Sequence, residues 1–269
     1  MSATARGRLP WVLLGALAVL TGGAAYLGVA QGPPAGPSGR WAALVATTDA
    51  AGPFTFTMTV RTTGDANTFE RISGTVDFAT ADATETTVER GSGISAQWSE
   101  TEVVHGVAYL RLGADLSGRL HYPSFWLRIP TSDVSFPLGS LGSGSSLPTI
   151  PEPAQLHRIG RATVADVPTT EYRFEPVAIS CPDAPAGRPT YVTNRTRVWV
   201  DQAGRIRRLA SAVDERLGGK PFDTSTVVTV GSFGVPLAVQ APRRAVGSAA
   251  SATTPPKSNP LAGCLVTPY

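Results

Sequence analysis

The sequence predicts an α+β domain in which a strongly curved antiparallel β-sheet carries one apolar face. Several segments alternate between apolar and polar residues, the period expected of strands covered on one side only. The clearest is 54–60, where Phe54, Phe56, Met58 and Val60 alternate with threonines. The 28 glycines and 23 prolines concentrate in turns and in both tails, as expected for many short strands joined by loops. The length of 269 residues with 42% hydrophobic residues is enough for one core.

The curvature is predicted from segment 195–214. An alternating strand ends at the turn 202–204, whose glycine accepts the positive φ that a short hairpin requires. On the return strand Ile206 and Leu209 have opposite parity, so a β-bulge near 207–208 is needed to keep both on the covered face. A bulge increases the local twist, and the sheet is therefore expected to curve.

Residues 1–30 are predicted to be a signal peptide or a membrane anchor. Arg6 and Arg8 precede the segment 11–30, which has no charged residue. Its first half has the length of a signal-peptide core, while its full length would just span a bilayer. We favour the anchor because the apolar run is long and a Pro/Gly tether, 31–37, follows it. Both alternatives place the rest of the chain outside the cytoplasm.

The domain itself is expected at 38–242, beginning with an amphipathic helix over 39–51. In this helix Trp41, Leu44 and Val45 form one apolar stripe, and Gly52-Pro53 ends it. The predicted strands are 54–60, 72–78, 84–90, 94–99, 102–112 with a turn inside it, 125–129, 156–164, 169–175, the two arms of the hairpin at 195–214, 224–230 and 237–241, the last closing the sheet.

Two segments depart from the strand pattern. Residues 132–151 are too rich in glycine for a firm helix and too apolar for a plain linker, which indicates a lid over the sheet. Residues 243–269 form a low-complexity tail that cannot bury enough surface to fold alone. The helix and the glycine-rich lid are expected to cover the concave face together.

Seven apolar residues from the first two strands are the candidates for binding an apolar ligand. They are Phe54, Phe56, Met58, Val60, Ile72, Val76 and Phe78. Their period places them on the covered face, where they either line a ligand cavity or form an ordinary packed core. The alternation of residues does not separate these two interpretations.

The chain has two cysteines, Cys181 and Cys264, the second within the tail. In an exported chain an even pair is most simply one disulfide, with two free thiols as the alternative. Closing a loop of this length would stabilise the protein by roughly 3–4 kcal/mol in the chain-entropy model. Two cysteines alone supply too few ligands for a metal site.

No catalytic residue, metal site or cofactor is predicted. His105, His121 and His157 are isolated in the sequence and are interpreted as surface or turn residues. No serine stands in a G-x-S-x-G motif, and no pair of carboxylates is placed for acid–base chemistry. The net charge of +3 is small and the arginines are spread over strands, so nucleic-acid binding is not expected.

The order of elements together with two short motifs resembles a known family. The motifs are Val-Trp-Val-Asp at 198–201, followed by Arg205, and Phe-Gly-Val-Pro at 233–236. Over 38–242 the chain resembles the actinobacterial cell-envelope lipoproteins of the LppX/LprG type, which belong to the LolA-like superfamily. The resemblance implies a half-barrel whose concave face holds a lipid or lipidated ligand, without catalytic residues. No cysteine follows the apolar segment at 29–31, so lipidation at that place is excluded.

The sequence therefore predicts an exported cell-envelope protein that binds a lipid or another apolar ligand as a carrier or sensor. The alternative is a non-catalytic interaction or stress-sensing module of the same fold with a filled cavity. The expected partners are a lipid or lipidated ligand, the membrane through the N-terminal segment and, for the alternative, an envelope protein.

Overall fold

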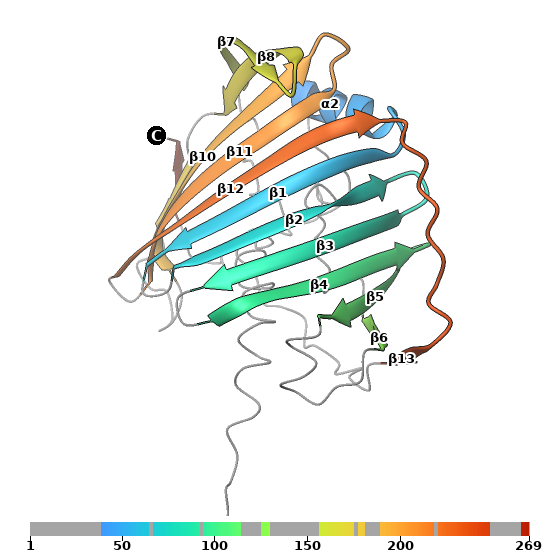
Figure 1. Ribbon diagram of the computed structural model, residues 1–269. Coiled ribbons are helices and arrows are strands. Elements are labelled where there is room, and N and C mark those ends of the chain that lie inside the picture. Colours follow the sequence, from blue (N-terminus) through green and yellow to red (C-terminus); the bar gives the residue numbers. More distant parts are fainter. Residues whose placement is uncertain are drawn as a thin grey trace, which may run out of the picture.

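The computed structural model describes residues 39–64, 67–91, 94–113, 125–129, 156–174, 177–180, 189–217, 220–247 and 265–268. These residues form one helix, α2 (Gly39–Asp49), and one sheet of 14 strands, shown in Figure 1. The strands are β1 (Phe54–Thr63), β2 (Thr68–Asp77), β3 (Asp82–Gly91), β4 (Ile94–Val104), β5 (Val107–Leu112), β6 (Trp126–Ile129), β7 (Leu156–Val164), β8 (Val167–Phe174), β9 (Val177–Ser180), β10 (Pro189–Asp201), β11 (Ile206–Leu217), β12 (Lys220–Phe233), β13 (Ala245–Gly247) and β14 (Leu265–Pro268).

The sheet is continuous and curved. Its strand order is β13-β6-β5-β4-β3-β2-β1-β12-β11-β10-β8-β7, while β9 pairs with β10 and β14. All described pairs are antiparallel except β13 with β6. Within the described strands the path does not return to its start, so the sheet stays open (Figure 1). The predicted α+β class and the strongly curved half-barrel are confirmed.

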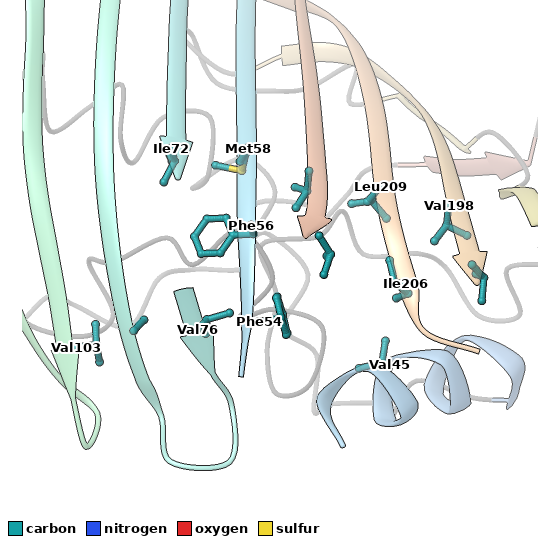
Figure 2. Close-up of a cluster of buried hydrophobic side chains, with 14 of the residues drawn as sticks. Val45, Phe54, Phe56, Met58, Ile72, Val76, Val103, Val198, Ile206 and Leu209 are labelled. Carbon is teal, nitrogen blue, oxygen red and sulfur yellow. The ribbon is translucent and has the colours of Figure 1, made fainter. Parts of the chain in front are cut away.

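One face of this sheet carries the core, and we call it the inner face. Its buried members include Phe54, Phe56, Met58, Ile72, Val76, Val198, Leu209 and Val228. They come from β1, β2, β10, β11 and β12, and Figure 2 shows the labelled ones on the same side of the sheet. The opposite side, which we call the outer face, carries mainly threonine and charged residues on β1 to β4. This division follows from the period-2 alternation of the sequence.

Helix α2 packs on the inner face at one end of the strands. Val45 joins the apolar cluster, and the ring of Trp41 meets that of Phe174 edge-on at 5.1 Å between centroids. The buried Thr48 hydroxyl accepts a hydrogen bond of 2.9 Å from the backbone N–H of Ile206. The helix is thus fixed to the start of β11 by a polar contact inside an apolar one.

The predicted bulge in the hairpin is present. Trp199 pairs with Arg208 and Val200 pairs with Ile206, which leaves Arg207 as the extra residue of β11. The bulge corrects the parity of the return strand, so that Ile206 lies in the core together with the residues beyond the bulge.

Asp201 closes the same hairpin with a buried carboxylate. It accepts hydrogen bonds from the backbone N–H groups of Ala203 and Arg205 and from the side chains of Arg205 and Arg207. Burial alone would raise the pKa of Asp201, but the hydrogen bonds from Arg205 and Arg207 outweigh it and lower this pKa. Gly204, with φ of 81°, provides the left-handed conformation that completes the turn.

The C-terminal part of the prediction needs correction. Residues 237–241 were expected to close the sheet as a strand, but 235–242 form no strand and β12 pairs with β1 instead. In Figure 1 this segment runs past the ends of the strands towards β13. Its alternating burial reflects an extended chain, and Pro236 and Pro242 have no N–H to give to a ladder.

The sheet also continues beyond residue 242. Within the expected tail, β13 joins the edge of the sheet at β6 and β14 joins β9, because edge strands offer unpaired backbone groups to short segments. The predicted anchor at 1–30, the lid at 132–151 and both cysteines lie outside the described residues. Within the described residues, no helix is long and apolar enough to cross a membrane.

Candidate functional site on the inner face

The structure places all seven candidate residues together on β1, β2 and the turn after β2. Phe54, Phe56, Met58, Ile72 and Val76 are buried, and Val60 and Phe78 are partly buried against them. Phe54 lies opposite Val76 and Met58 opposite Ile72 across the two strands. The placement on one shared face is as expected, whereas the ligand-binding role stays a prediction.

The two ends of this group differ in their packing. Near α2 the ring of Phe54 is fully buried, with centroids 5.7 Å from Phe78 and 5.4 Å from Phe233. Such an aromatic cluster is a packed core. Met58 and Ile72 lie further along the strands, away from the helix, as Figure 2 shows. Both belong to the same buried cluster as Phe54, at its end away from the helix.

Three glutamates share the inner face with these apolar residues, and the sequence analysis missed them. Glu70 lies opposite Val60 on β1 and opposite Glu89 on β3. Glu85 lies opposite Gly74 on β2. Glu70 is only 9% exposed and Glu85 only 7% exposed, although both carry a carboxyl group.

These carboxyl groups are poorly satisfied. One oxygen of Glu70 and one of Glu85, Oε1 in each, is buried without a hydrogen-bond partner. Burial, together with the nearby Glu89, raises the pKa of Glu70 to about 7. Burial, together with Glu70, raises the pKa of Glu85 to about 8, and burial also raises the pKa of Glu89. The inner face thus holds three carboxyl groups whose pKa values are all raised above the ordinary value for glutamate.

On the outer face, in contrast to the inner face, glutamates form ion pairs with arginines. Glu100 of β4 pairs with Arg111 of β5, and Glu171 of β8 pairs with Arg197 of β10. On β1 to β5 the described inner-face positions carry apolar residues, small polar residues and the three glutamates, with no lysine, arginine or histidine among them. On β1 to β5, the inner carboxyl groups therefore face each other rather than a cation of these strands.

The histidines do not extend this site. His105 forms the turn between β4 and β5, with its side chain 80% exposed and Nδ1 3.4 Å from an oxygen of Asp82. His157 lies on β7, and His121 is outside the described residues. Within the described ranges, no group of three histidine, cysteine or acidic residues has the geometry of a metal site.

The inner face thus defines the site as a one-sided apolar surface that also holds three glutamates. Glu85 lies level with Gly74 and Phe56, and Glu70 and Glu89 lie level with Val60. Comparison with protein families finds no matching family, and comparison with curated proteins finds no match. Among solved structures, the chain is similar to the lipoprotein LppX of Mycobacterium tuberculosis, with 14% identity and a TM-score of 0.39 over 74% of this chain and 98% of that one. It is also similar to a LolA superfamily protein of Nitrosomonas europaea, with 7% identity and a TM-score of 0.29 over 73% and 94% of the two chains.

Proposed function

We propose that this protein is a non-catalytic binder of a lipid or another apolar ligand, acting as a carrier or sensor outside the cytoplasm. The observation that carries the proposal is the extent of the apolar inner face beyond the end at which α2 packs. This face extends over strands from β10 to β2, whereas α2, the single described helix, packs at one end of it. A sheet with one apolar face requires a cover, and a ligand supplies part of that cover in this proposal.

The binding surface is assigned to the far end of the seven-residue group. Phe54 and its aromatic neighbours serve as core, because their rings already contact one another. Met58, Val60 and Ile72 serve as the ligand surface, since they lie beyond the helix and Val60 is only partly buried. The flexible thioether of Met58 suits a surface that accepts apolar chains of different shape.

The uncharged segment at 11–30 supports a location at the membrane, where the domain would exchange its ligand with the bilayer. The alternative is an interaction module in which the same face is entirely filled. The complete burial of Phe54, Val198 and Val230 favours this alternative for the end near α2. The two functions therefore differ in whether the part of the inner face around Met58 binds a ligand or is filled by the chain itself.

The experiment compares wild type with Met58→Trp. If Met58 lines a ligand surface, the larger ring takes space that ligand occupies, so co-purifying lipid decreases while the melting temperature stays nearly unchanged. The assay is a thermal melt beside organic extraction and mass spectrometry of the full-length protein from its own membrane. Thr57→Trp, on the outer face of the same strand, is the matched control and should keep both properties.

A filled core gives the opposite pattern. Overpacking then costs about 1–3 kcal/mol of stability. A large loss of stability in Met58→Trp with unchanged lipid content would end the carrier proposal for this face.

A further inference from the structure

The acidic cluster of the inner face has no function in a site that binds only apolar chains. Glu70 and Glu89 lie one inner-face position beyond the level of Met58 and Ile72, and Glu85 lies one inner-face position before it, on the side of α2. Carboxyl groups are rarely buried this deeply without a partner, because each loses its hydration. Something other than packing must account for them.

The described chain does not supply the missing partner. The Oε1 atoms of Glu70 and Glu85 are buried and accept no hydrogen bond. The charge of Glu89 raises the pKa of Glu70, and the charge of Glu70 raises the pKa of Glu85. The carboxylates therefore repel one another when they are ionised. Removing this repulsion requires either protons or a cation brought in from outside.

The surroundings of Glu85 are consistent with a polar group approaching it. Gly74, opposite Glu85, has no side chain, because the space that its β-carbon would take is filled by the backbone carbonyl of Thr84. On the other side, Glu85 faces Thr101, whose buried hydroxyl can donate or accept a hydrogen bond. Thus Glu85 has a glycine on one side and a threonine hydroxyl on the other, instead of an apolar side chain on each side.

An ammonium group meets these requirements better than other head groups. It carries a full positive charge and three donors, which is enough to reach two carboxylates at once. A hydroxyl offers one donor and no charge, whereas a phosphate or carboxylate would be repelled by the ionised cluster. The apolar residues beside the cluster would hold the attached chain.

We propose that Glu70 and Glu85, assisted by Glu89, form the head-group subsite for an amphiphile that bears a protonated amine. The ammonium group lies over Ile72 and Thr87, between the levels of Glu70 and Glu85, and the alkyl chain lies beside it on Met58 and Val60 of β1. This subsite rests on the proposed function, because it uses the same apolar surface for the chain.

The test uses three probes that differ only in the head group: decylamine, decanol and decanoate. Binding to the full-length protein is measured at pH 7.5 by native mass spectrometry after release from detergent. Wild type should bind decylamine at least about tenfold more tightly than decanol, with decanoate weakest, because charge-assisted hydrogen bonds are about twice as strong as neutral ones.

The variant Glu70→Gln/Glu85→Gln keeps the shape of both side chains and removes their charge. It should bind decanol as wild type does and lose the preference for decylamine. Glu102→Gln is the matched control, since Glu102 lies on the outer face of β4, and it should retain the preference. A folded double variant is expected because the substitution relieves an existing repulsion, and its thermal melt verifies this.

Each outcome decides between the two proposals. Equal binding of decylamine and decanol by wild type, or an unchanged preference in the double variant, overturns the amine subsite while leaving the apolar surface standing. Failure of all three probes to bind wild type overturns the proposed function and the subsite together.

Discussion

The buried glutamates make a sharp prediction about how stability depends on pH. A carboxyl group whose pKa is higher in the folded than in the unfolded protein holds its proton longer when folded. The unfolded protein then binds fewer protons, and the free energy of unfolding decreases as the pH rises. For Glu85 the window runs from its ordinary pKa of 4.5 to about 8. Below this window the group is protonated in both states and costs nothing.

The magnitude follows from the same two values. The difference between 4.5 and about 8 corresponds to about 5 kcal/mol, at 1.36 kcal/mol for each pKa unit. Part of it comes from the charge of Glu70, so replacing Glu85 alone recovers less. We expect Glu85→Gln to be more stable than wild type at pH 8.5 by on the order of 3 kcal/mol, and about equal to it at pH 4.5.

The assay is urea denaturation of the full-length protein at intervals between pH 4.5 and 9. Asp201 does not confuse this window, because its pKa is lowered and its contribution is lost only when the pH falls below about 4. Glu171→Gln, on the outer face of β8, is the control and should follow the wild-type slope. Parallel curves for wild type and Glu85→Gln would refute the argument that burial holds this carboxyl protonated.

Two further predictions concern the contacts that fix the ends of the chain. Thr48→Val should lower the free energy of unfolding by about 1–3 kcal/mol, because it leaves the buried N–H of Ile206 without an acceptor. Thr48→Ser keeps the hydroxyl and should retain the stability. Urea denaturation distinguishes the two variants, and equal free energies of unfolding would argue against the bond. We also propose a disulfide between Cys181 and Cys264, because β9 and β14 pair Ser180 with Leu265, which are the sequence neighbours of the two cysteines. Both cysteines should resist alkylation without reductant, and Cys264→Ser should lower the free energy of unfolding by roughly 3–4 kcal/mol. Labelling of both cysteines in the native protein would exclude the bond.

The sequence predicts the parts of this fold that depend on local parity. The bulge near 207–208 could be placed because Ile206 and Leu209 cannot both be covered without an extra residue. The shared face of the residues on β1 and β2 likewise follows from alternation alone. In both cases each strand contains the information itself, and its partner is not needed.

The parts that depend on pairing could not be predicted in the same way. Residues 237–241 alternate like a strand, yet nothing in their sequence states whether another strand lies beside them. The pairing of β1 with β12 joins segments more than 150 residues apart, and no local signal marks it. Shorter but still long separations, 119 residues from Trp126 to Ala245 and 85 from Ser180 to Leu265, likewise hide the partners of β13 and β14 in the expected tail.

The acidic cluster depends both on the local alternation of residues and on the pairing of strands. Glu70 has the parity of Ile72, which was a visible signal that it lies on the covered face. A polar residue at the end of an apolar pattern is normally assigned to the edge, so Glu70 alone was not conspicuous. Only the register of β2 with β3 shows that it faces Glu89 and lies near Glu85.

The cluster also bears on why the inner face is not simply a core. Apolar residues of similar volume at Glu70 and Glu85 would avoid the cost of burying carboxyl groups, and such replacements are often neutral or stabilising in proteins. A sequence that keeps two unsatisfied carboxyl groups there departs from the local rules that the rest of the sheet obeys. Departures of this kind are expected at functional sites, where stability is lost to a ligand requirement. An apolar surface that contains such carboxyl groups matches an amphiphile better than it matches either a purely apolar molecule or a filled interior.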